Sequence, residues 1–242
     1  MYRFFCYAML FLAFSCQKPD PDTISPEYPD WYTIKAPVDE EIFGVWGDYD
    51  NTLLISTITS VFRSTDQGKN WQKVAQPTAS VFGFLMYRDT LFAFDGLLTR
   101  NGLAQSLTNA SRFSTDDGVT WQPYRRYNPD LDAFEKASPS PLAVNPVRST
   151  SGTEYAINRV YLDPPTQATR RFETPGIIAQ TNRRIDLPQL HQLRSLYLDR
   201  QQRLYIAGTD AVCGRGHAGE NFFFCNSKSG RGVVYISKRP QP

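Results

Sequence analysis

The sequence predicts an all-β protein built from repeated four-stranded units. Residues 64–71 and 114–121 share the pattern S-x-D-x-G-x-x-W, and the two copies start 50 residues apart at Ser64 and Ser114. Short runs of β-type residues bounded by turn residues surround both copies, and segments with a helical period are almost absent. A repeat of this length is typical of stacked or radially arranged supersecondary units. We therefore expect one repetitive domain over residues 30–242.

The repeated pattern resembles the Asp-box, or BNR repeat, of sialidase-type β-propellers. It is carried by Ser64, Asp66, Gly68, Trp71, Ser114, Asp116, Gly118 and Trp121. A Ser or Asp side chain accepts hydrogen bonds from backbone N–H groups in a tight turn, and Gly adopts a positive φ without strain. The resemblance implies a propeller in which each box joins the third and fourth strands of a blade, with the Trp packed beneath the turn. It implies a structural role away from the usual binding face.

Strand-type runs assign the blades. Blade one takes residues 42–46, 52–56, 61–64 and 71–75, and blade two takes 81–87, 90–94, 111–114 and 121–124. Blade three is weaker and takes residues 142–144, 154–161, 171–172 and 184–187. Within it, residues 171–176 (RFETPG) echo residues 112–118 (RFSTDDG), but no Trp follows. The last blade has only three runs, at residues 194–198, 203–207 and 233–237.

The missing strand of the last blade is predicted at the other end of the chain. Residues 30–37 (DWYTIKAP) align with residues 70–77 (NWQKVAQP), which follow the first box. An N-terminal strand that completes the last blade closes the ring and leaves few free edges. We therefore expect a small β-propeller of four blades closed by an N-terminal strand. Five blades are the alternative, if residues 125–186 contain another.

The first residues predict export. Arg3 precedes an apolar run over residues 4–14, which is shorter than the ~18–20 residues of a spanning helix, so residues 1–15 are a signal peptide. Residues 12–16 (LAFSC) resemble a bacterial lipobox, which implies lipidation of Cys16. An ordinary signal peptidase is the alternative. Residues 16–29 are then a tether, on an outer-membrane or cell-surface lipoprotein, or on a periplasmic or secreted protein without the lipid.

Cys213 and Cys225 flank a loop near the C-terminus and can form a disulfide in an oxidising compartment. The rival interpretation is a metal site with His217 as a third ligand. Eleven residues between the two cysteines is not a zinc-site spacing, and His217 has no nearby partner in the sequence. We therefore predict a disulfide, with no metal and no cofactor.

Long loops gather on one predicted face of the ring. The connections from second to third strands, and the links between blades, share the face on which propellers usually bind ligands. Residues 95–110, 125–141 and 208–232 are all long connections of this kind, and long loops are often functional. Arginine forks and aromatic rings suit carboxylated sugars or peptides. The candidate ligand-binding residues are Arg100, Arg125, Arg126, Arg215, His217 and Phe223. Each could also be an ordinary solvated loop residue.

The resemblance to sialidases implies three arginines on the substrate, a Tyr–Glu pair and an acidic residue, spread over six blades. This chain is too short for six blades, and Lys35 stands where the first arginine would be needed. Other glycoside hydrolases use two carboxylates about 5–9.5 Å apart across a cleft. The candidates here are Asp95, Asp163, Asp210 and Glu220. The sequence contains no G-x-S-x-G elbow and no phosphate-binding loop.

Charge and composition narrow the function further. The net charge is only +2 and the Lys and Arg residues are scattered, which argues against nucleic acid as a partner. The favoured prediction is a surface-anchored, non-catalytic binding or scaffold propeller that recognises an extracellular glycan or a surface protein, with the membrane reached only through a lipid anchor. The alternative is a reduced, sialidase-like glycoside hydrolase that acts on extracellular glycans.

Overall fold

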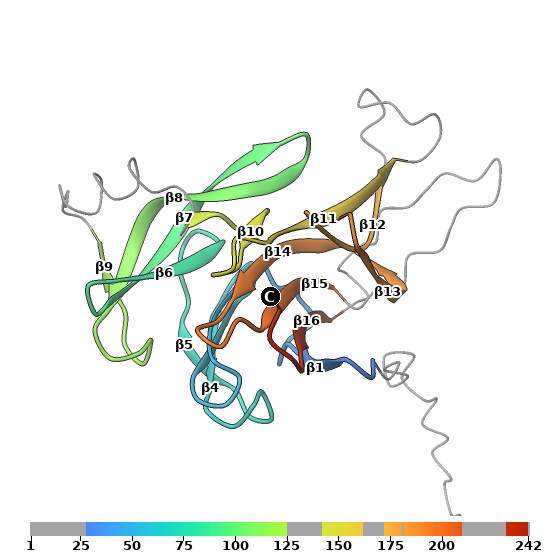
Figure 1. The fold of residues 1–242 in the computed structure, drawn as a ribbon. Coiled ribbons are helices and arrows are strands. Elements are labelled where there is room, and N and C mark those ends of the chain that lie inside the picture. The colour runs from blue at the N-terminus through green and yellow to red at the C-terminus, as the bar shows by residue number, and fades with distance from the viewer. Residues whose placement is uncertain (1–27, 125–141, 162–171, 181, 210–230, 242) are drawn as a thin grey trace, which may run out of the picture.

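The computed structural model describes residues 28–124, 142–161, 172–180, 182–209 and 231–241. These residues form a four-bladed β-propeller: four antiparallel sheets of four strands each lie around a common centre (Figure 1). The predicted fold class and blade number are confirmed, and the five-bladed alternative is wrong for the part of the chain that the structure describes.

Blades 1 and 2 follow the predicted strand order. Blade 1 consists of β2 (Gly44–Gly47), β3 (Leu53–Ser56), β4 (Val61–Ser64) and β5 (Gln72–Ala75). Blade 2 consists of β6 (Gly83–Tyr87), β7 (Thr90–Arg100), β8 (Leu103–Ser114) and β9 (Gln122–Pro123). In both sheets the strands lie in sequence order, and β2 and β6 contact each other near the centre of the ring.

Residues 95–110 of blade 2 are not the loop that the sequence predicts. They extend β7 and β8 into a long hairpin, here called the arm. Asn101 and Gly102 form its tip, with φ of 52° and 82°. Two successive positive φ values define the type I′ turn, whose twist matches that of the two strands it connects. The Asn-Gly pair at the tip therefore explains why this segment pairs with itself.

Blade 3 departs most from the prediction. It consists of β10 (Val147–Arg148), β11 (Glu154–Tyr161), β12 (Phe172–Ala179) and β13 (Arg184–His191). The strand predicted at residues 142–144 is wrong, because this segment bonds to other blades instead. Ala143 forms an isolated bridge with Ser106, and the Val144 carbonyl accepts the N–H of Leu196 at 2.7 Å. The innermost strand of the blade therefore begins only at Val147.

The echo of the turn motif in blade 3 is also not a turn. Residues 172–176 lie within β12, and the chain turns later, at residues 180–183, where Asn182 has a φ of 60°. The segment lacks both the Asp of the motif and its Trp. Without these groups nothing fixes a turn at this place, and the strand continues.

Blade 4 closes the ring as predicted. It consists of β14 (Leu193–Leu198), β15 (Leu204–Thr209), β16 (Gly232–Ser237) and the N-terminal strand β1 (Trp31–Lys35). β1 lies antiparallel beside β16, with Ile34 opposite Val234 (Figure 1). Ile34 is buried in a core cluster that also contains residues of β2 and β3, so the closing strand joins the last blade to the first.

The two turn motifs, at residues 64–71 and 114–121, have the same internal hydrogen bonds. The Ser64 hydroxyl accepts the N–H of Gly68 at 2.9 Å, and the Asp66 carboxylate accepts the N–H of Asn70 at 2.9 Å. The glycine has a φ of 78° in both copies. The second motif repeats these bonds with Ser114, Gly118, Asp116 and Thr120. Both turns thus have the geometry expected from their residues.

Each turn motif also packs against the blade that precedes it. A Cβ on Gly68 would lie 2.4 Å from the Ile34 side chain of blade 4, and one on Gly118 would lie 2.7 Å from Leu54 of blade 1. The tryptophans that follow are only half-buried, although Trp121 donates its indole N–H to the Gly118 carbonyl at 3.1 Å. The motifs therefore join neighbouring blades as well as neighbouring strands.

Several predictions concern residues outside the described part of the chain. These are the signal peptide, most of the tether, the lipidation site Cys16 and the Cys213–Cys225 disulfide, all of which stay predictions. Within the residues that are described, no helix is long and apolar enough to cross a membrane.

Candidate functional site

The main cavity of the described structure lies in the central channel of the propeller. It has a volume of about 560 Å³, within the range of small-ligand pockets, and is here called the cup. Its walls are the inner strands β2, β6 and β14 together with Ala143 and Val144. The segment that replaces the predicted inner strand of blade 3 therefore provides the fourth wall.

The cup opens at the end of the channel where first and second strands are joined. Asn51, Asp117 and Arg200 line this mouth and are exposed. A smaller cavity of about 90 Å³ lies at the other end, beneath the arm. Phe43 and Phe82 line it and meet edge to face, with centroids 5.5 Å apart. The arm and these rings narrow the channel there, so its wide mouth is on the face opposite the predicted binding face.

Deep in the cup, Gly44 and Gly83 approach each other closely. A Cβ on Gly44 would stand 2.6 Å from the Cα of Gly83, which is closer than side-chain carbons approach backbone atoms. Both glycines line the cup, and each occupies the first position of the innermost strand of its blade. A ring of only four blades has a narrow centre, and these glycines let blades 1 and 2 meet there.

The mouth of the cup carries charges of both signs on opposite blades. Asp117 belongs to the turn motif of blade 2, and Arg200 belongs to the β14–β15 turn of blade 4. The backbone carbonyl of Asp117 is fixed by the Nε of Arg63 at 3.1 Å. Many of the residues that line the cup below the mouth are apolar: Val45, Trp46, Phe84, Leu85, Met86, Leu107 and Leu196.

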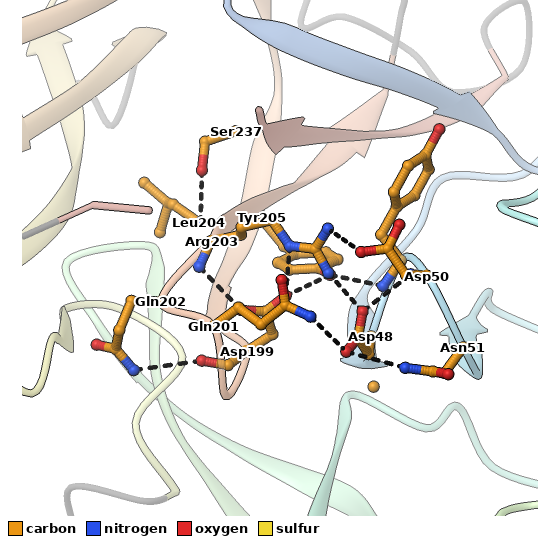
Figure 2. A network of polar contacts seen from close by, with 12 residues as sticks. Asp48, Asp50, Asn51, Asp199, Gln201, Gln202, Arg203, Leu204, Tyr205 and Ser237 are labelled. Atoms are coloured by element: carbon orange, nitrogen blue, oxygen red, sulfur yellow. Dashed lines mark hydrogen bonds and ion pairs between the residues drawn. The ribbon is translucent and has the colours of Figure 1, made fainter. Parts of the chain in front are cut away.

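A buried ionic network supports one side of the mouth (Figure 2). Arg203, whose side chain is 7% exposed, bonds to Asp48, to Asp50 at 2.8 Å and to Asp199 at 2.8 Å. Asp199 is fully buried and also accepts the hydroxyl of Tyr205 at 2.9 Å. Because Asp48 and Asp50 belong to blade 1 and the others to blade 4, the network ties the two blades at the ring's closure.

The network sets the protonation of the cup wall. Burial alone would raise the pKa of Asp48, but the N–H of Asp50 and the charge of Arg203 outweigh it and hold this pKa below the usual value. Burial raises the pKa of Tyr197 to about 12, and burial with the charge of Asp199 raises the pKa of Tyr205. The carboxylate in the cup wall is therefore ionised and the tyrosines are neutral near pH 7.

The arm contacts blade 3 through Leu103, which is buried in a core cluster with residues of that blade, and through Arg159 at its tip. The Arg159 side chain of β11 donates a hydrogen bond to the Asn101 carbonyl at the tip of the arm. Its guanidinium lies over the rings of Tyr161 and Phe172, 5.0 and 5.2 Å from their centroids. Sequence reasoning missed this contact, although Asn-Gly at residues 101–102 is a strong hairpin signal that would have predicted the arm.

Two predicted site residues are described, and neither reaches the cup. Asp95 lies at the base of the arm, where its carboxylate accepts a hydrogen bond from Asn109. Arg100 is exposed beside the arm tip. The remaining candidates lie outside the described residues and stay predictions: Asp163, Asp210, Glu220, Arg125, Arg126, Arg215, His217 and Phe223. No cluster of three potential metal ligands occurs among the residues whose placement is described.

Comparison with known proteins gives structural neighbours only. No family profile and no curated protein sequence matches the chain. Similar solved structures include one described as YCF48 bound to D1 peptide and one described as YCF48 from Cyanidioschyzon merolae. Each is 12% identical with a TM-score of 0.28; the alignments cover 77% and 74% of this chain and 68% and 67% of the neighbour. A likeness this distant does not extend to function, which has to be argued from the cup itself.

Proposed function

We propose that this protein is a non-catalytic binding propeller that holds a segment of a partner protein in the cup. The observation that carries the proposal is the cup itself, a cavity of about 560 Å³ lined by many apolar residues and by the charged residues Asp48, Asp117 and Arg200. Sites of this kind take up apolar groups in their depth and use a few polar groups to fix orientation. Arg200 and Asp117, at the mouth, are placed to fix the orientation of the ligand.

The polar groups of the cup favour binding over hydrolysis. A glycoside hydrolase needs one carboxyl group that keeps its proton near neutral pH. Asp48 has the opposite property, because its pKa is lowered, and its oxygens are occupied by Arg203, Asn51 and Gln201. Asp95, the one predicted catalytic residue that is described, bonds to Asn109 in the arm, away from the cup.

The composition of the walls favours a protein segment over a glycan. Most of the wall side chains are aliphatic or aromatic, and the polar side chains are concentrated at the mouth. The wall side chains offer few partners to the hydroxyl groups that a sugar carries on all sides. An apolar side chain of a peptide has no such groups, and its burial is favourable.

We further propose that the protein is exported and anchored through lipid on Cys16, with the propeller held outside the membrane. The support is the signal-like composition of residues 1–15 and the lipobox-like residues 12–16. Metabolic labelling with a fatty-acid analogue tests this, because label should enter the wild-type protein and not the Cys16→Ser variant. Equal labelling of both proteins would contradict the anchor.

The binding proposal is tested with the full-length protein on two arrays, one of random linear peptides of about twelve residues and one of extracellular glycans. Wild-type protein should bind a subset of the peptides, and Arg200→Trp, which places an indole at the mouth of the cup, should lose these signals. Arg184→Trp is the matched control, because Arg184 is exposed on β13 of blade 3, away from the cup. Binding only to glycans, or peptide binding that Arg200→Trp leaves intact, would contradict the proposal.

A further inference from the structure

We infer that the ligand binds as an extended strand whose main chain hydrogen-bonds to the inner edge of β6, at Phe84 and Met86. This inference rests on the proposed function and specifies how the cup recognises its ligand. It concerns peptide main chain, so the recognition would depend on alternate amide groups of the ligand more than on any one of its side chains.

The register of the β6–β7 hairpin shows which backbone groups face the cup. Its loop is Arg88–Asp89, with φ of 46° and 59°, and the closing pair is Tyr87 and Thr90. The residues that close a two-residue type I′ loop exchange hydrogen bonds with each other, and pairs alternate from there. The N–H and C=O of Met86 and Phe84 therefore point away from β7 and toward the channel.

The same alternation is visible directly in the other two inner strands. In β2, the N–H of Gly47 points across the channel and donates to the Tyr197 hydroxyl at 3.4 Å. In β14, the N–H of Leu196 points away from β15 and donates to the Val144 carbonyl at 2.7 Å. One inward-facing N–H in each of these two strands, that of Gly47 and that of Leu196, thus has a partner outside its own blade.

Like β2 and β14, β6 has no partner strand on its inner edge; it differs from them in that, among the described residues, the N–H groups of Phe84 and Met86 have no hydrogen-bond partner. Among the described strands its one neighbour is β7, on the outer side. Five consecutive residues, 82–86, line the cup, as expected where a strand presents its edge rather than one face. An unpaired edge of this kind is a template for another extended chain.

The surroundings of this edge suit a peptide from a partner protein. The wall side chains on either side are apolar and can receive alternate side chains of an added strand. At the mouth, Asp117 and Arg200 stand on opposite blades, so a peptide with a basic and an acidic group flanking its buried part matches both charges. A chain entering from the mouth meets Met86 before Phe84, because Met86 is nearer the β6–β7 turn.

A proline substitution tests the inference within the protein. Proline lacks the N–H and is tolerated at strand positions whose N–H does not join the ladder. Met86→Pro should therefore keep the β6–β7 pairing and lose the inward-facing donor, while Met86→Ala removes the side chain and keeps the donor. With the peptide that binds most tightly on the array, we expect Met86→Pro to weaken affinity on the order of tenfold relative to Met86→Ala. Equal affinities of two variants with similar melting temperatures would overturn the inference.

An N-methyl scan of the same peptide gives a second test that does not depend on the variant folding. Methylation removes one amide donor at a time, and an added strand donates to its neighbour only from alternate residues. Loss of binding at every second position is expected. If every N-methylated peptide still binds, and Arg200→Trp still abolishes that binding, the cup is the ligand site but strand addition is overturned. Binding that Arg200→Trp does not affect would instead contradict the proposed function.

Discussion

Arg203 is a buried cation whose three guanidinium nitrogens bond to carboxylates of two blades. Replacing it with Met leaves Asp199, which is fully buried, without its charge partner. Removing one partner from a buried ionic group destabilises a protein by about 3–5 kcal/mol. We expect Arg203→Met to lose that much free energy of unfolding in urea titrations.

The matched control for this variant is Arg148→Ala. Arg148 also forms an ion pair, with Glu154 at 3.0 Å, but both side chains are well exposed. Exposed pairs contribute about 0–1 kcal/mol. If both variants lose a similarly small free energy of unfolding, the ion pairs of Arg203 are not shielded from water as described.

The two turn motifs predict how stability depends on pH. Hydrogen bonds from Asn70 and Ser64 lower the pKa of Asp66 to about 2, and bonds from Thr120 and Ser114 lower that of Asp116 to about 2. A carboxyl group with a folded pKa below its unfolded value stabilises the native state while ionised. This contribution is present above about pH 4 and is lost as the pH falls toward 2.

Urea midpoints measured from pH 5 to pH 2 test this prediction. The wild-type midpoint should fall over that range, and the double variant Asp66→Asn/Asp116→Asn should fall less, because neither motif can then titrate. Parallel curves for the two proteins would mean that the hydrogen bonds of the turns do not depend on the carboxylate charge.

At the scale of the elements, the arm is a hairpin that depends on a contact with a different blade. Arg159 holds its tip, and the tip itself is otherwise exposed. Arg159→Ala should therefore speed hydrogen exchange in residues 97–104 and leave the melting temperature nearly unchanged, because few core contacts are lost. Arg183→Ala, at an exposed arginine that bonds to Gln241, is the control. Unchanged exchange in the arm would contradict the role given to Arg159.

Elements with strong local signals could be predicted from the sequence, and the others could not. The strands around the first turn motif and the closing strand β1 are predicted within a few residues, because turns and alternation mark them locally. In blade 3 the segment at residues 142–144 has strand-like residues, but its hydrogen-bond partners are Gln105 and Leu196 of other blades. Only the closed ring brings those partners together.

At the scale of the whole molecule, the ring depends on β1. Ile34 is 5% exposed and packs against the turn motif of blade 1 at Gly68. Ile34→Ala should lower the free energy of unfolding by about 2–5 kcal/mol, the range for large-to-small core substitutions. Thr33→Ala, on the same strand but only partly buried, is the control. A negligible effect of Ile34→Ala in urea unfolding would contradict closure of the ring through this strand.

The cup could not be predicted from the sequence for a related reason. Its network joins residues 48–50 to residues 199–203, about 150 positions away, and its free edge at β6 is made of backbone groups that carry no side-chain signature. Sequence reasoning searched for charged and aromatic loop residues and therefore favoured the opposite face. Ring closure decides which strand edges face the channel, and the composition of the strands does not reveal it.

Hydrogen exchange of the full-length protein, with and without the tightest-binding peptide from the array, distinguishes the cup from the opposite face as the ligand site. We expect slower exchange in the peptide complex at β2 and β6, above all at Val45, Phe84 and Met86, whose amides face the cup. Slower exchange confined to the arm and to residues 57–60, with β2 and β6 unchanged, would place the ligand on the other face and contradict the cup as the binding site.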